Sequence, residues 1–289
     1  MDELSQKLFH LSHCPSMTWN RIFRLLKADP SLKHIYSYSA RHFSEVLSTP
    51  MKKSLQIYQE IHSFDIHQSL NIYNRYQIKF FPIYDSNYPR LLKQIPTPPW
   101  GLYAAGDSRL LSDEKKIAFV GSRKGNDYGK KVISEFIPPL VEEKFIIVSG
   151  LASGIDSFSH QAALQADGKT IAVLGGGFCH LYPKENAPLA KLIAEKGLLI
   201  SEYPPNRKPK KWHFPERNRI ISGMTIGTVV IQAGKRSGSL ITVQHALEQG
   251  KEVFAVPGAI FDPLSEGTHD LIADGAHLVR NAEDIIKAF

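Results

Sequence analysis

The sequence predicts a doubly wound α/β fold, with a mostly parallel sheet flanked by helices, preceded by a small all-helical domain. From Lys115 onward, short apolar runs rich in β-branched residues alternate with amphipathic stretches of helical length. Strands that are apolar on both faces and are each followed by a helix indicate parallel strands joined by helical crossovers. Several of these runs end in glycine and serine, the residues expected where a strand turns into a helix. Before Lys115 the pattern is different.

Residues 1–80 are expected to form the helical domain. Leu4, Leu8 and Leu11 recur at helical spacing, and Thr18 is a suitable N-cap for a second helix. Apolar residues that support the second helix and one or two later helices are Trp19, Ile22, Phe23, Leu26, Leu55, Ile61, Ile66, Leu70 and Tyr73.

Residues 81–112 are expected to be a proline-rich linker and extension. Prolines stand at positions 82, 89, 96, 98 and 99, directly before the apolar stretch Trp100–Tyr103. Proline lacks an N–H group and fixes φ, so this density argues against a regular helix or a central strand. We expect the domain boundary in this region.

Residues 113–289 are expected to form the α/β domain. The predicted strands are Ile117–Val120, Phe145–Ser149, Thr170–Leu174, Leu198–Ser201, Thr228–Gln232, Val253–Val256 and Ala276–Val279. The predicted helices are Tyr128–Glu143, Asp156–Ala166, Glu185–Lys196 and Leu240–Gln249.

The ends of these strands predict an anion-binding site. Ligands of such sheets lie beyond the carboxyl ends of the strands, where helix N-termini offer free N–H groups. Glycine lets that backbone approach an anion closely, serine adds hydroxyl donors, and nearby cations add charge. The candidate contacts are Gly121, Ser122, Arg123, Ser153, Gly154, Lys184, Asn218, Lys235, Arg236, Ser237 and Gly238. For any one turn, glycine could equally serve only to close the turn.

The glycine spacing argues against a bound nucleotide cofactor. Gly121, Gly125 and Gly129 are four apart, so they do not form the G-x-G-x-x-G dinucleotide fingerprint, and no G-x-x-x-x-G-K-[ST] motif is present. The two cysteines, Cys14 and Cys179, have no metal-site spacing. We therefore expect neither NAD, ATP nor a metal ion.

A basic and aromatic segment suggests a polymeric anion. The chain has a net charge of +7, and Arg207–Arg219 holds six basic residues against Glu216 alone. Trp212 and Phe214 interrupt these cations, and single strands are held by cations on the backbone with rings stacked on bases. A solvated basic loop, and core packing of the two rings, remain open alternatives.

These residues, in this order, resemble the DprA/Smf family, the DNA-processing proteins of bacterial natural transformation. The resemblance runs from about Tyr88 to Val279. The shared segments are Val120–Arg123, Ser149–Asp156 followed by His160, Thr170–Gly177, Tyr182–Asn186, Leu199–Glu202, Phe214–Gly223, Ser237–Thr242, Val253–Gly258, Gly267–His269 and Asp274–Ala276.

The resemblance implies an extended Rossmann-like domain that binds single-stranded DNA without base specificity, protects incoming DNA, forms a homodimer and loads a RecA-type recombinase. It places DNA contacts at Arg123 and Lys184, and the dimer surface at His269, Ile272 and Leu278. It also implies a SAM-like N-terminal domain. The loop from Ser12 to Thr18 lacks the glycine that a DNA-binding helical hairpin would use, so we expect this domain to be auxiliary.

An alternative reading is a Rossmann-fold nucleotide phosphoribohydrolase resembling the LOG proteins. That chemistry needs a glutamate on the helix after Gly238, where this chain has Gln244, and an amide is not a general base. Asp156 is expected to cap its helix and His160 to pack in the fold. We therefore expect no enzyme.

The chain is expected to be cytoplasmic, without a membrane span. Residues Met1–Leu11 lack an apolar signal core, and no apolar run approaches about 20 residues. Two cysteines without a disulfide framework suit a reducing compartment.

Overall fold

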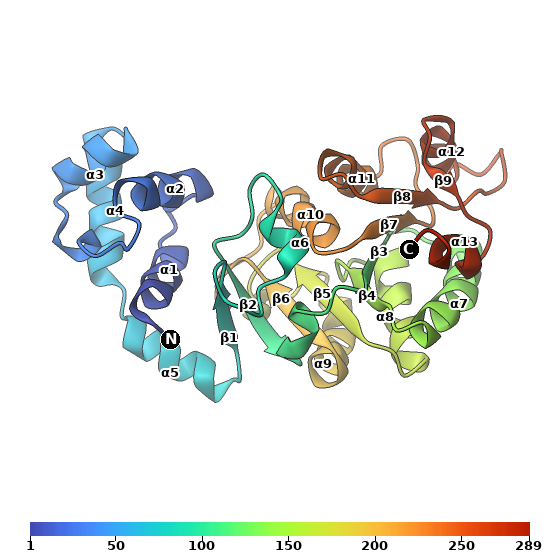
Figure 1. Cartoon of the computed structure of the whole chain (residues 1–289), viewed down its shortest axis with the longest axis horizontal. Helices are drawn as coiled ribbons and strands as arrows, with labels where there is room; N and C mark the ends of the chain where they lie inside the picture. Colours follow the sequence, from blue (N-terminus) through green and yellow to red (C-terminus); the bar gives the residue numbers. More distant parts are fainter.

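The computed structural model describes all 289 residues, and its first part is the expected helical domain. Five helices, drawn in blue and cyan in Figure 1, pack around buried residues such as Leu8, Leu25, Phe43 and Ile57. The side chains of Asp2, Ser39 and Asp65 cap three of them by accepting backbone N–H bonds. The helices are α1 (Glu3–His13), α2 (Trp19–Ala28), α3 (Ala40–Leu47), α4 (Met51–Ser63) and α5 (Ile66–Arg75), with a 3₁₀ turn η1 (Ile35–Ser37).

A single nine-stranded sheet forms the rest of the molecule, with the order β1-β2-β6-β5-β4-β3-β7-β8-β9. Strands β3 to β9 are parallel, whereas β2 runs antiparallel to both β1 and β6. The predicted α/β class is confirmed, and each of the predicted strands lies within two residues of an observed one. The strands are β1 (Lys79–Pro82), β2 (Gly101–Gly106), β3 (Lys116–Val120), β4 (Ile146–Ser149), β5 (Thr170–Leu174), β6 (Leu198–Ser201), β7 (Gly227–Val230), β8 (Glu252–Ala255) and β9 (His277–Leu278).

The expectation that the proline-rich region excludes a central strand was wrong. Strand β2 lies between β1 and β6 and pairs with both. The prolines fall in the connection instead: Pro82 ends the edge strand β1, and Pro89 precedes the short helix α6 (Arg90–Lys93). Because Gly101–Gly106 itself contains no proline, its backbone is free to pair on both sides.

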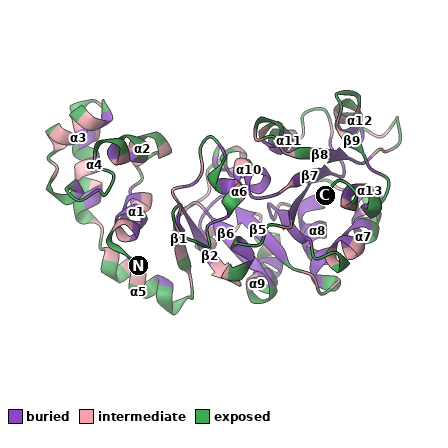
Figure 2. Ribbon diagram, viewed as in Figure 1, coloured by how far each residue is buried: buried purple, intermediate pink, exposed green.

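Helices cover both faces of the sheet, as alternate residues of β3 show. Ala118 and Val120 belong to one hydrophobic cluster, with buried residues of α6, α10 (His213–Gly223) and α11 (Ser239–Glu248). Ile117 and Phe119 belong to another, with residues of α7 (Asp127–Glu142), α8 (Ile155–Gln165) and α13 (Ala282–Ile286). Both clusters are buried, as the purple strands of Figure 2 show. The remaining elements are α9 (Ala187–Lys196), α12 (Glu266–Ala273) and the 3₁₀ turns η2 (Ser108–Leu111), η3 (Phe178–His180) and η4 (Lys184–Asn186).

The order of strands reverses between β3 and β7. From β3 the chain adds β4, β5 and β6 on one side, and then returns to add β7, β8 and β9 on the other. The loops that leave β3 and β7 therefore diverge to opposite faces and open a crevice at their carboxyl ends. None of the helices combines the length and apolar character needed to cross a membrane.

Candidate nucleic-acid interface

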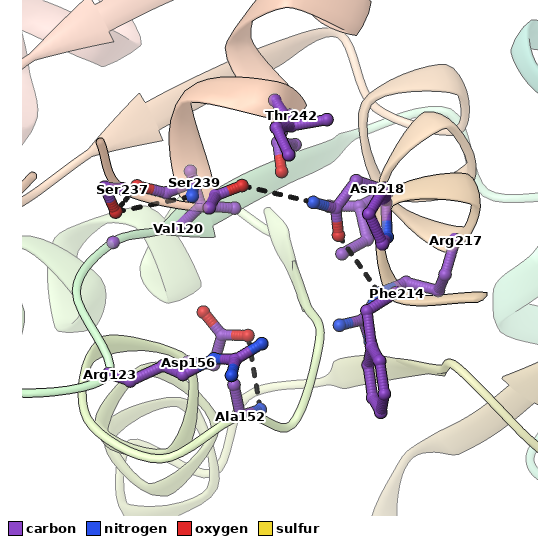
Figure 3. A pocket seen from close by; sticks show the side chains of 15 residues that line it. Val120, Arg123, Ala152, Asp156, Phe214, Arg217, Asn218, Ser237, Ser239 and Thr242 are labelled. Carbon is purple, nitrogen blue, oxygen red and sulfur yellow. Dashed lines mark hydrogen bonds between the residues drawn. The ribbon is translucent and has the colours of Figure 1, made fainter. Parts of the chain in front are cut away.

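A pocket of about 370 Å³ opens where the strand order reverses (Figure 3). Its walls come from the turns after β3 and β4, from one side of α10, and from the first turn of α11. Because α8 and α11 both begin at this pocket, the positive ends of two helix dipoles face it, and neither helix start is capped by a side chain. The lining residues are Val120, Gly121, Arg123, Ala152, Asp156, Phe214, Pro215, Arg217, Asn218, Ile221, Ser237, Gly238, Ser239, Ile241 and Thr242.

Glycine is required where the turn after β3 meets the start of α8. A Cβ atom on Gly121 would lie 2.7 Å from Cγ1 of Ile155, and one on Gly154 would lie 2.4 Å from the carbonyl oxygen of Ser122. Gly154 also has φ of +74°, which L-residues with a side chain rarely adopt. The backbone N–H of Ile155 donates to the same Ser122 oxygen, at 3.2 Å. The turn after β3 is thereby held directly against the N-terminus of α8.

The opposite wall is the segment that leads into α11. The hydroxyls of Ser237 and Ser239 are 2.7 Å apart and hydrogen-bonded. The side-chain amide of Asn218 donates to the carbonyl oxygen of Gly238 at 3.4 Å, which ties α10 to this segment. Two hydroxyls and an amide therefore lie beside the helix start.

The floor contains a buried guanidinium and a buried carboxylate. Arg217 Nη1 donates to the carbonyl oxygens of Gly150, at 2.6 Å, and of Val173. Asp156 Oδ2 accepts from the N–H groups of Gly150 and Ala152, each at 3.2 Å. Burial raises the pKa of Asp156 and the charge of Arg217 opposes this, while burial lowers the pKa of Arg217 to about 10. Arg217 thus stays protonated at neutral pH, and the neighbouring Asp156 carboxylate opposes its charge beneath the pocket.

Asp156 does not cap its own helix, which corrects the expectation from the sequence. It is the second residue of α8, whose N-cap is Gly154. Its carboxylate turns back to the N–H groups of the preceding turn, because those groups have no strand partner beyond the end of β4.

The four predicted cations on the turns are exposed, and none forms an ion pair within the chain. Arg123 lines the pocket and also a small neighbouring cavity of about 50 Å³, which it shares with Ser153, Tyr182 and Pro183. Lys184 follows Pro183 directly, in η4. Lys235 and Arg236 precede Ser237 on the loop beyond β7 and line neither cavity.

The structure brings most of the predicted contacts to one edge of the sheet. Gly121, Arg123, Asn218, Ser237 and Gly238 line the pocket itself. Ser122 and Gly154 form the turn junction below it, whereas Lys184, Lys235 and Arg236 lie on adjoining loops. The predicted dimer residues are elsewhere: His269 and Ile272 on α12 and Leu278 on β9, at the far edge of the sheet (Figure 1).

Several lining residues were missed or misplaced by the sequence reasoning. Arg217 counted as one cation of an exposed basic stretch, yet its side chain is buried under the pocket. Ser239 and Thr242 were not singled out, although their places in the first turn of a helix after a glycine gave the signal. Helix α10 itself was not among the predicted helices, and Pro215 stands in its first turn. Proline is tolerated in a first turn, where its missing N–H has no partner to lose.

The side chains considered for an enzymatic role form hydrogen bonds within the fold. His160 is buried and hydrogen-bonded through Nδ1 to the Thr170 hydroxyl at 2.6 Å, as expected. Gln244 lies outside the pocket and donates to Glu248 at 3.0 Å. No group of three or more histidine, cysteine, aspartate or glutamate side chains is arranged to hold a metal ion.

Comparisons with known proteins agree with this architecture. Residues 79–289 match the family model for DNA recombination-mediator protein A. The DNA processing protein DprA of Bacillus subtilis is 46% identical over 90% of this chain and 87% of its own length. The crystal structure of DprA from Streptococcus pneumoniae, at 36% identity, superposes with a TM-score of 0.86 over 100% of this chain and 99% of that chain. A Helicobacter pylori DprA structure, described as showing a single-stranded DNA binding mode, has 29% identity and a TM-score of 0.67 over 74% of this chain and 95% of that one. The chain belongs to the DprA/Smf family of DNA-processing proteins.

Proposed function

We propose that the chain binds single-stranded DNA, without base specificity, at the pocket between α8, α10 and α11. The observation that carries this proposal is the position of Arg123. Its exposed guanidinium has no acidic partner in the chain and borders a pocket at which two helix N-termini converge. Such a site attracts phosphate groups, and contacts to the phosphate backbone carry no sequence information.

The path of the strand follows from the exposed cations around the pocket. Lys184 lies on one side, beside Tyr182 and the cavity that Arg123 shares, and Lys235 and Arg236 lie on the other, next to Ser237. Phosphates bound to these groups would cross the sheet edge from η4 to the loop beyond β7. Phe214, half-buried in the wall of both cavities, offers a ring face for one base.

The wider role that we propose is that of a mediator in natural transformation. The chain would protect incoming single strands and load a RecA-type recombinase onto them in the cytoplasm. Its membership of a family of DNA-processing proteins supports this role, and the structure reported for the Helicobacter pylori relative supports the class of substrate. We further propose that it acts as a homodimer, through the surface that includes His269, Ile272 and Leu278.

A gel-shift comparison of single-stranded and duplex DNA tests the proposed substrate. The same oligonucleotide sequence is presented alone and annealed to its complement, and two unrelated sequences are compared. We expect the parent to shift both single strands at equal protein concentration and duplexes only at higher concentration. The charge-matched control is Lys130→Glu, an exposed site on α7, which should bind as the parent does. Equal affinity for duplex, or dependence on sequence, would contradict the proposal.

A further inference from the structure

A second, larger groove lies between the helical domain and the sheet. Its volume is about 730 Å³, roughly twice that of the pocket. It is formed by the loop between α1 and α2, by the segment that enters β2, and by the segment from Glu202 to Arg219. The chain has three tryptophans, and all of them line this groove: Trp19, Trp100 and Trp212. We call it the tryptophan groove.

The rings of the helical-domain wall are fixed in place. Trp19 stacks on Trp100, with ring centroids 5.2 Å apart and an interplanar angle of 22°, and also on Phe23 at 5.4 Å. The indole N–H of Trp19 donates to the carbonyl oxygen of Pro98, and that of Trp100 donates to the carbonyl oxygen of Trp19. Both indole N–H groups are therefore used internally, and the ring orientation is set by the protein.

The opposite wall is less constrained. Trp212 is 58% exposed, which excludes the core-packing alternative left open for it, and its indole N–H has no partner in the chain. The ammonium group of Lys210 lies over this ring, 5.0 Å from its centroid. Behind it, Tyr203 stacks on His213 at 4.1 Å. In single-strand binding, an exposed ring of this kind stacks on a base and a cation beside it binds the adjoining phosphate.

The charges of the tryptophan groove favour an anion. The Arg207 guanidinium donates to the carbonyl oxygens of Ser12 and His13 at the end of α1, which leaves its positive charge without a carboxylate. Of the two acidic residues in the lining, Glu202 is paired with Arg219 at 2.6 Å and Glu216 accepts from the Tyr203 hydroxyl. Lys208 and Lys211, exposed on the same loop, add further positive charge.

The tryptophan groove adjoins the pocket. Pro215, in the first turn of α10, lines both. Phe214 faces the pocket, while Trp212 and His213, just before it, face the groove. A strand that left the pocket over this turn would meet Trp212 and Lys210 next.

We propose that the tryptophan groove is a second binding site for single-stranded nucleic acid, which stacks bases of the same strand on Trp212 and holds the intervening phosphates with Arg207, Lys210 and Lys211. This inference rests on the proposed function, since the strand reaches the groove from the pocket. The helical domain takes part by forming one wall of the groove and by holding Arg207 through the carbonyl oxygens of Ser12 and His13.

The three indoles make the proposal directly measurable, because no tryptophan lines the pocket. Bases stacked in the groove should quench indole emission, whereas a strand confined to the pocket should not. Two labelled oligothymidylates are titrated into the full-length chain, one of about 6 nucleotides, within the usual site size of about 4–16, and one of about 30, well beyond it. Anisotropy reports binding and tryptophan fluorescence reports occupancy of the groove. We expect quenching with the long strand only.

Trp212→Ala should weaken binding of the long strand about tenfold, which corresponds to about 1.4 kcal/mol and to the loss of one stacked base. Binding of the short strand should be unchanged. The double variant Lys210→Glu with Lys211→Glu should make the affinity for the long strand less dependent on salt and leave the salt dependence for the short strand unchanged. Tyr76→Ala removes a comparably exposed ring (69% exposed) outside the groove lining. This control should bind the long and the short strand as the parent does. Arg123→Glu should weaken binding of both the long and the short strand. If it weakens binding of neither, the proposed function fails. If Arg123→Glu weakens both while Trp212→Ala and the indole emission show no effect with the long strand, the groove proposal alone is overturned.

Discussion

The guanidinium of Arg217 donates a 2.6 Å hydrogen bond to the carbonyl oxygen of Gly150, whose own N–H is bound by the carboxylate of Asp156. The carbonyl oxygen and the N–H group of Gly150 are thus held by buried side chains of opposite charge. A Cβ atom at position 150 would lie 2.5 Å from Arg217 Nη2, so only glycine leaves room for this contact. The turn after β4 owes its shape to these bonds, and that turn forms one wall of the DNA-binding pocket we propose.

Arg217→Gln should lower the free energy of unfolding by about 3–5 kcal/mol, because it leaves the Asp156 carboxylate buried without its countercharge. Adding Asp156→Asn should restore part of that loss, since the remaining buried group is then neutral. The coupling free energy between Arg217 and Asp156 is measured by urea unfolding of the parent, both single variants and the double variant. If the losses in unfolding free energy of the two single variants sum to that of the double variant, the two side chains act independently.

Gly154→Ala should destabilise the chain by at least about 1 kcal/mol more than Gly250→Ala. Both glycines have positive φ, +74° and +65°, but a Cβ atom at position 250 meets nothing within 4 Å, whereas at 154 it meets the Ser122 carbonyl. Position 154 therefore adds a steric conflict to the positive φ that both positions share. Thermal or urea unfolding provides the comparison, and equal losses would show that the junction between the turn and α8 tolerates a side chain.

Folding stability should fall as the pH is lowered from about 6.5 toward 4. Burial lowers the pKa of His160 to about 3, and burial lowers those of His10 and His13 to about 4. In the unfolded chain these groups take up protons near pH 6.5, so below that pH the unfolded state binds more protons than the folded one. Each such histidine contributes a slope of at most about 1.4 kcal/mol per pH unit.

His160→Gln should therefore reduce the slope of unfolding free energy against pH between about 6.5 and 5. His67→Gln, at an exposed position on α5, is the matched control. The measurement is urea unfolding at a series of pH values. An unchanged slope in His160→Gln would mean that folding does not lower the pKa of this histidine.

His269→Ala with Leu278→Arg should convert the proposed dimer to a monomer. Leu278 lies on the two-residue edge strand β9 and is 46% exposed, so an arginine there can be solvated in the monomer but not in an apolar interface. Leu247→Arg, at another exposed apolar position on α11, is the control and should leave the dimer intact. Sedimentation velocity at matched concentrations distinguishes the outcomes, and a double variant that still sediments as a dimer would place the interface elsewhere.

Much of the α/β domain could be predicted from the sequence, because strand and helix periods alternate regularly there. The seven predicted strands, from β3 to β9, are all present, and the glycine-rich ends of β3, β4 and β7 do meet at one edge of the sheet. Parallel strands place all their carboxyl ends together, so order along the chain sufficed to predict that edge.

The remaining features depend on contacts between distant segments. Strand β2 was missed because its prolines lie in the preceding loop, and its partners β1 and β6 are far from each other in sequence. The burial of Arg217 could not be inferred, since charge alone does not tell a solvated cation from one bonded to Gly150 and Val173. Likewise, the meeting of Trp19, Trp100 and Trp212 in one groove depends on how the helical domain packs against the sheet.

The central claim, that Arg123 and Lys184 hold the phosphates of a single strand, is tested most directly by the salt dependence of binding. Affinity for an oligothymidylate is measured by anisotropy over a range of salt concentrations for the parent, Arg123→Glu, Lys184→Glu and the control Lys130→Glu. Each phosphate neutralised on a single strand contributes about −0.7 to the log–log slope. We predict weaker binding and a flatter slope for the first two variants and parental values for the control; parental affinity and slope in both Arg123→Glu and Lys184→Glu would contradict the account.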